Sequence, residues 1–109
     1  MKNIQEKYKF YNIFKLPIPQ KEEEFYTLLK HKNVRIVAIT SSNILEEHLY
    51  VQDEDEWVML IEGEAHLEID GQSIFLKSGD TLFLPAETPH RVLETKKGTR
   101  WLAVHIDPL

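Results

Sequence analysis

The sequence contains no cysteine among its 109 residues. Disulfide bridges and thiolate metal sites are therefore excluded, because both need cysteine sulfur. Any metal ion that this chain binds must be held by nitrogen and oxygen ligands from histidine, carboxylate, amide or phenol side chains.

Long apolar runs and an excess of basic charge are also missing. No run approaches the roughly 20 apolar residues of a membrane span, and residues 1–9 lack the apolar core of a signal peptide. The 13 basic and 18 acidic side chains leave a net charge of -5, which disfavours a nucleic-acid surface. We therefore expect a soluble, cytoplasmic protein with no membrane or nucleic-acid partner. Its length suits one domain, residues 1–109.

Short apolar strands separated by turn residues make up most of the chain. Asp70 and Gly71 form a two-residue hairpin signal, and similar polar or glycine-containing turns recur along the sequence. Such spacing is typical of an all-β sandwich or barrel. The expected strands are residues 34–40, 47–52, 57–61, 65–69, 74–76, 81–84, 90–93 and 100–106.

The first 33 residues are predicted to be an arm followed by a helix. Ile13 and Phe14 suggest a short strand in the arm. Residues 21–31 are predicted to be helical, because acidic residues crowd their first turn and basic residues their last. An apolar stripe at i, i+3 and i+4 within this segment agrees with that prediction. Residues 34–109 then form the barrel.

Two spaced sets of residues carry a family resemblance. Glu56 is followed after six residues by Gly63, and Gly79 is followed after five residues by Pro85, with His90 five positions further on. This pattern resembles the two motifs of the cupins. The resemblance implies a double-stranded β-helix, which is a jelly-roll barrel. More narrowly, Tyr50 with residues 52–58, 90–92 and 101–105 resembles a group of small uncharacterised bacterial cupins with one domain. The resemblance also implies a homodimer.

The sequence departs from the metal-binding members of this family at the first motif. Those members carry His-x-His three or four residues before the glutamate, which places either Tyr50 and Gln52 or Leu49 and Val51 at these positions. The first pair is chemically more plausible as ligands. The glycine of the second motif is Glu87 here. The three-histidine ligand set implied by the family is therefore absent, and a metal site would depend on other donors.

Tyr50, Gln52, Glu56 and His90 are predicted to line one cavity. Gln52, Glu56 and His90 are candidate ligands for a divalent transition metal such as Fe, Mn, Ni or Zn. Tyr50 is a candidate ligand or acid–base group, and it joins Glu56 as a candidate catalytic residue. The alternative interpretation is that Glu56 and His90 only hydrogen-bond each other, since buried charges usually pair.

Further residues are predicted around this cavity. Val58, Leu60 and Val92 are expected to supply its apolar lining. His105 shares a strand face with Trp101 and is either an additional ligand or proton carrier or, as we favour, ordinary packing. His48 is a substitute ligand only if the strand register slips, and the barrel rim is its favoured place.

Two further sets of residues have two possible roles each. Trp57, Met59 and Ile61 are predicted to face away from Glu56, either as core between sheets or, together with the arm, as a dimer surface. Arg91 and Arg100 either clamp an anionic substrate or, as we favour, pair with surface carboxylates.

Two functional hypotheses follow. The first is a metal-dependent enzyme of the oxygenase or isomerase type acting on a small molecule, which is the activity that the family resemblance implies. The second is a small-molecule binder or sensor that uses the same pocket without a metal and without catalysis.

Overall fold

The computed structural model describes residues 7–109, and eight strands dominate it. The strands are β1 (Glu23–His31), β2 (Val34–Ser41), β3 (Asp55–Glu62), β4 (Glu64–Ile69), β5 (Gln72–Lys77), β6 (Thr81–Leu84), β7 (His90–Thr95) and β8 (Thr99–Ile106). In the part of the chain that is described, no helix has the length and apolar character needed to cross a membrane.

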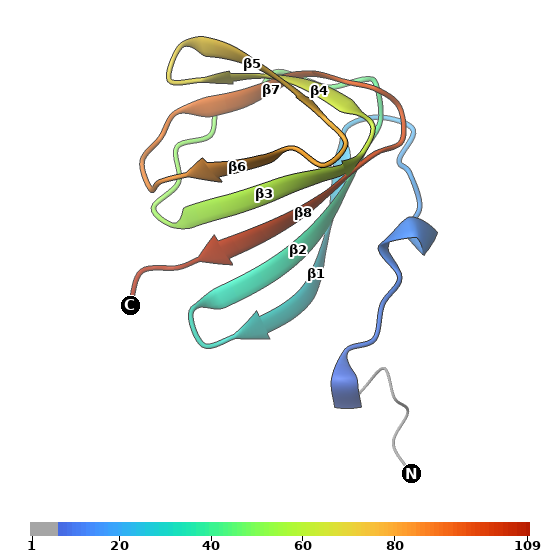
Figure 1. The fold of residues 1–109 in the computed structure, drawn as a ribbon, viewed down its shortest axis with the longest axis vertical. Helices are drawn as coiled ribbons and strands as arrows, with labels where there is room; N and C mark the ends of the chain where they lie inside the picture. Colours follow the sequence, from blue (N-terminus) through green and yellow to red (C-terminus); the bar gives the residue numbers. More distant parts are fainter. Residues whose placement is uncertain (1–6) are drawn as a thin grey trace.

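The strands form two antiparallel sheets that face each other (Figure 1). The larger sheet has the order β1-β2-β8-β3-β6, and the smaller one has the order β5-β4-β7. Non-consecutive strands lie side by side in both sheets, as expected of a jelly roll rather than a simple meander. The predicted all-β class is confirmed.

The helix predicted over residues 21–31 is wrong, because β1 occupies this segment. β1 pairs antiparallel with β2 through a tight turn in which Lys32 has a positive φ of 53°. A bulge between Thr27 and Leu29 shifts the register, which disturbs the alternation that identifies a strand. The five-stranded sheet therefore begins at Glu23, inside the segment expected to be arm and helix.

Two smaller predictions are also wrong. Residues 47–52 form no strand, and Tyr50 makes only an isolated bridge to His90. Ile13 and Phe14 belong to η1 (Ile13–Lys15), a 3-10 turn in which the Asn12 side chain accepts a hydrogen bond from the Phe14 N–H. Side-chain capping thus decides the local structure there.

The core lies between the two sheets. On the larger sheet, Leu60 and Trp101 are direct cross-strand partners, and Val58 faces Ala103 in the next inward row. Leu67 and Leu76 complete the core from the smaller sheet. Alternate residues point inward on each strand, so a row of cross-strand partners shares one face.

Gly63 turns the chain from β3 in one sheet into β4 in the other. Its φ is +107°, and a Cβ atom there would lie 2.7 Å from the Cα of Thr99. Only glycine accepts both the backbone angle and this close approach at low cost. The second residue of the Glu56–Gly63 pattern is thus explained by the packing of β3 against the start of β8.

Candidate functional site

A cavity of about 90 Å³ opens between the two sheets, and we call it the inner chamber. Its walls are mostly apolar, with a few polar side chains from several strands. The lining residues are Glu23, Phe25, Ile39, Tyr50, Gln52, Glu56, Val58, Leu67, Leu84, His90, Val92, Trp101 and His105. This composition, with apolar walls and a small number of converging polar groups, is typical of a ligand pocket.

Glu56 reaches the inner chamber from the start of β3, where it lies opposite His105 of β8. Its Oε1 accepts a hydrogen bond of 3.2 Å from Gln52 Nε2, and its Oε2 lies 3.8 Å from His105 Nε2. The Glu56 side chain is only 10% exposed. The carboxylate therefore has one hydrogen bond and a second oxygen in a looser contact with an imidazole.

His90 enters the chamber from the smaller sheet, at the start of β7. Its Nδ1 lies 2.9 Å from the carbonyl oxygen of Thr88 and donates a hydrogen bond to it, because a carbonyl oxygen can only accept. The ring stacks on Tyr50 with centroids 5.5 Å apart. Backbone hydrogen bonds in both directions between Tyr50 and His90 hold the two residues together.

Glu23 is a second carboxylate in the chamber, and sequence reasoning misses it because the acidic run around it predicts a helix. It lies opposite Ser41, whose hydroxyl donates a short hydrogen bond to Glu23 Oε2. Ser41 Oγ in turn accepts a hydrogen bond of 3.0 Å from Trp101 Nε1. Burial raises the pKa of Glu23, and the nearby Glu22 and Glu56 carboxylates raise it further, against the Ser41 hydrogen bond.

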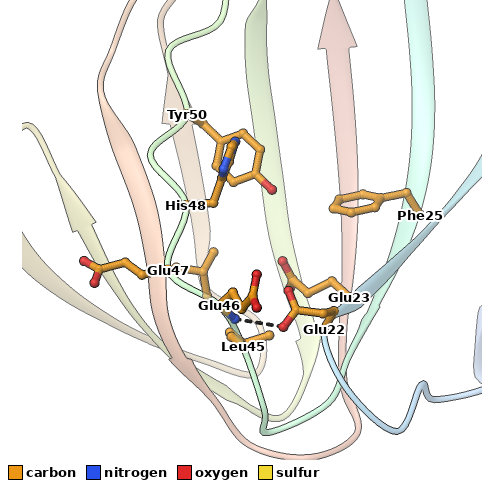
Figure 2. Close-up of a pocket in the computed structure, with 9 residues that line it drawn as sticks. Glu22, Glu23, Phe25, Leu45, Glu46, Glu47, His48 and Tyr50 are labelled. Carbon is orange, nitrogen blue, oxygen red and sulfur yellow. Dashed lines mark hydrogen bonds between the residues drawn. The ribbon is translucent and has the colours of Figure 1, made fainter.

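A larger, more polar cavity of about 270 Å³ adjoins the inner chamber, and we call it the outer chamber (Figure 2). The loop before Tyr50 forms one wall and the start of β1 forms the other. Its lining residues are Glu22, Glu23, Phe25, Leu45, Glu46, Glu47, His48, Tyr50 and Val92. Four of these residues also line the inner chamber, so the two chambers meet at a neck formed by Glu23, Phe25, Tyr50 and Val92.

The structure brings most of the residues predicted for the site into the inner chamber. They are Tyr50, Gln52, Glu56, Val58, His90, Val92 and His105. Leu60 is instead a fully buried core residue packed beyond the chamber, and His48 is an exposed residue that lines the outer chamber. His48 therefore lies at the rim, and its ring contacts Tyr50 edge-on at 4.5 Å.

The two arginines considered as anion clamps engage other partners. Arg91 lies 2.8 Å from Glu47 and 3.1 Å from Glu68. Arg100 donates to the carbonyl oxygens of Ile13 and Leu16 and so holds the N-terminal arm. Both residues therefore act as structural cross-links.

The donors of the inner chamber do not fit a preformed metal centre. Within residues 7–109, no three His, Asp or Glu side chains are grouped so that they hold one ion. Gln52 points its amide nitrogen, a hydrogen-bond donor, toward Glu56. As they lie, Gln52, Glu56 and His105 hold one another by polar contacts, and metal coordination would require them to move.

Comparison with known proteins places the fold in a family. A family model described as a cupin domain matches residues 42–105, which is more than half of the chain. The chain therefore belongs to the cupins, and the predicted resemblance is confirmed. The jelly-roll arrangement of the two sheets agrees with this family.

Individual relatives resemble the chain to different extents. A crystal structure from Ralstonia eutropha, named as a candidate mannose-6-phosphate isomerase, has a TM-score of 0.81 and 35% identity over 91% of this chain and 98% of its own. A cupin superfamily protein from Desulfitobacterium hafniense has a TM-score of 0.71 and 21% identity, over 85% of this chain and 84% of its own, and shows the fold alone.

A curated relative matches about half of the chain. It is an uncharacterised protein of Methanocaldococcus jannaschii, 32% identical over 57 residues, or 52% of this chain. The matched stretch spans 43% of that protein's own length, so the chain covers less than half of this relative.

Proposed function

We propose that this cupin binds a small organic molecule in the inner chamber and the neck. The observation that carries the proposal is a largely apolar cavity into which Glu56, His90 and Glu23 project from three different strands. The apolar walls provide affinity by removing ligand surface from water, and the polar groups orient the ligand.

A cavity-filling variant tests this proposal. Val92 lines both chambers, so Val92→Phe would place an aromatic ring in the neck. We expect compounds that raise the melting temperature of the parent in a thermal-shift screen of small metabolites to lose their effect on this variant. Val51→Phe is the matched control, because Val51 is exposed and lines neither chamber. Compounds that stabilise all three proteins equally would bind elsewhere and refute the proposal.

We propose, as a second function, that Gln52, Glu56 and His90 hold a divalent metal. The hydrogen bond made by His90 Nδ1 favours this proposal. The contact of Nδ1 with the Thr88 carbonyl leaves Nε2 free to coordinate, as outer hydrogen bonds commonly do for metal-ligating histidines. When bound, Fe, Mn, Ni or Zn would supply a Lewis acid for an oxygenase or isomerase type of reaction. In that case Tyr50 and Glu56 would contact the substrate.

Elemental analysis and equilibrium dialysis decide the metal proposal. This second proposal predicts close to one ion per chain in the parent, and clear loss of binding in Glu56→Gln and His90→Ala. His66→Ala is the control, because His66 lies on the outer side of the smaller sheet beside Ser73. Equal metal binding by the parent and both site variants would refute this assignment.

We further propose a homodimer through the outer face of the five-stranded sheet. Trp57, Met59, Leu102 and Val104 are half-buried there, and Phe83 is 53% exposed. A contiguous apolar face of this kind is unusual on a monomer. Met59→Asp should halve the mass measured by sedimentation equilibrium, whereas a parent that already sediments as a monomer would refute the dimer.

A further inference from the structure

The two chambers are lined by acidic side chains, and this bears on the charge of a ligand that they could bind. Among the described residues that line them, five are glutamates and none is lysine or arginine. A cavity lined by one sign of charge concentrates ligands of the opposite sign. Carboxylates that are already neutralised by a partner within the chain contribute little to the attraction of a cation.

Two of the five carboxylates are engaged. Glu47 pairs with Arg91 at 2.8 Å, and Figure 2 shows its carboxylate directed away from the other glutamates. Glu22 Oε1 accepts a hydrogen bond of 2.8 Å from the backbone N–H of Glu46. Neither group is available in full to a ligand.

The other three have no lysine or arginine partner among the described residues. They are Glu23 at the neck, Glu46 in the outer chamber and Glu56 in the inner chamber. Figure 2 shows the carboxylates of Glu22, Glu23 and Glu46 gathered below the Tyr50 hydroxyl. Burial raises the pKa of Glu23, and the neighbouring carboxylates of Glu22 and Glu56 raise it further.

An unsatisfied carboxylate oxygen in the inner chamber points independently to a ligand. The Glu56 side chain is nine-tenths buried, yet its Oε2 has only the 3.8 Å contact with His105, which is longer than a hydrogen bond. The buried Nδ1 of the same histidine has no hydrogen-bond partner in the described part of the chain. A buried polar atom such as His105 Nδ1 is costly unless a water or ligand satisfies it.

The sizes of the chambers bear on the length of the ligand. Neither the 90 Å³ nor the 270 Å³ cavity alone reaches the range of roughly 300–1,000 Å³ that is usual for ligand sites, but the two together do. A ligand that occupies both must pass Glu23 at the neck.

We propose that the two joined chambers bind an organic cation, with an apolar body in the inner chamber and an ammonium group at Glu23. This proposal rests on the proposed small-molecule function and narrows it to amines. It also separates this chain from a phosphosugar isomerase, the activity suggested by the name of the Ralstonia eutropha protein, because a phosphate group needs arginine, lysine or a helix N-terminus.

Three probes of similar shape and different charge test the proposal. Benzylamine, benzyl alcohol and benzoate are titrated against the protein at neutral pH, and the indole N–H signal of Trp101 is followed by NMR. Trp101 lines the inner chamber and connects to Glu23 through Ser41, so its signal reports occupancy. We expect benzylamine to bind about tenfold more tightly than benzyl alcohol, the effect of one charge-assisted hydrogen bond, and benzoate to bind least.

The variant Glu23→Gln should weaken benzylamine by about tenfold and leave benzyl alcohol unchanged. Glu47→Gln is the matched control in the same chamber and should leave both affinities nearly unchanged. Equal binding of the three probes, or an unchanged affinity for benzylamine in Glu23→Gln, would overturn the amine assignment while the small-molecule function stands. Failure of all three probes to shift Trp101 at millimolar concentrations would overturn both.

Discussion

The two faces of the five-stranded sheet are built from alternate residues of the same strands, yet they differ in what they bury. Leu60 and Ala103 on the inner face are 0% exposed and belong to a core that encloses a cavity. Met59 and Leu102, their neighbours in sequence on the outer face, are only half-buried. Both faces are apolar, so the difference arises because only one of them is covered by the second sheet. Hydrophobic pattern alone therefore does not distinguish core from interface.

The two faces should differ most in the free energy of unfolding that is lost when neighbouring residues, one from each face, are truncated. Leu60→Ala should lower the free energy of unfolding by about 2–5 kcal/mol, because it leaves a cavity in a close-packed core. Met59→Ala should cost only about 1 kcal/mol, because a half-buried side chain loses less on truncation. Urea unfolding of both variants measures the difference, and equal losses would contradict the contrast.

A smaller effect is expected from buried hydrogen bonds. Ser41→Ala removes the acceptor of Trp101 Nε1 and a donor to Glu23, at a cost of about 1–3 kcal/mol for the unsatisfied groups. Tyr26→Phe on the outer face removes only an exposed hydrogen bond to the Glu24 carboxylate, which water replaces. Its cost in the same unfolding assay should be clearly lower. A larger loss for Tyr26→Phe would reverse the comparison.

The inner face also carries a pH-dependent penalty. The pKa of Glu23 is raised in the folded chain above its ordinary value of 4.5, mainly by burial. Ionisation therefore favours the unfolded chain, and stability falls as the pH rises from about 4.5 through the folded pKa. Glu23→Gln should raise the melting temperature at pH 7 and lose this advantage at pH 4. A difference in melting temperature that stays constant with pH would exclude Glu23 ionisation as the source of the penalty.

The smallest effect is expected where the inner face reaches solvent. Arg35 lies opposite His105 in the sheet and pairs with Asp107 at 3.0 Å, and this guanidinium lowers the pKa of that carboxyl. A lowered pKa gives stability that is present above the unfolded value near 3.8 and is lost as the pH falls. Asp107→Asn should slightly lower the melting temperature at pH 7 and not at pH 3. Equal effects at both pH values would rule out the ion pair as the cause.

The sequence predicts the barrel and part of the candidate site because those features are local. Gly63 marks a sheet crossing by its position after an apolar strand, and Asp70-Gly71 marks a hairpin. The fixed spacing from Glu56 to Gly63 and from Gly79 to His90 identifies the family fold. These signals depend on neighbouring residues and turn chemistry, which a sequence displays directly.

The remaining features depend on contacts between distant residues. Glu22, Glu23 and Glu24 resemble the first turn of a helix, and only pairing with β2 makes this segment a strand. A helix at this point hides the position of Glu23 in the chamber. Glu23, Phe25 and Thr27 share one face of β1 at the two-residue spacing of a strand. The bulge between Thr27 and Leu29 interrupts this spacing, so the sequence does not reveal the strand.

β1 has a consequence for the dynamics of the protein. It is an edge strand that pairs with β2 alone, and most of its residues are at least partly exposed, Phe25 at 58%. Edge elements with few buried contacts open at low free energy without global unfolding. Because β1 supplies Glu23 and Phe25 to the neck, each such opening would widen the passage between the chambers. The exchange rate of the β1 amide hydrogens, compared with that of the β2 amides, would therefore report how often the passage opens for ligand entry and release.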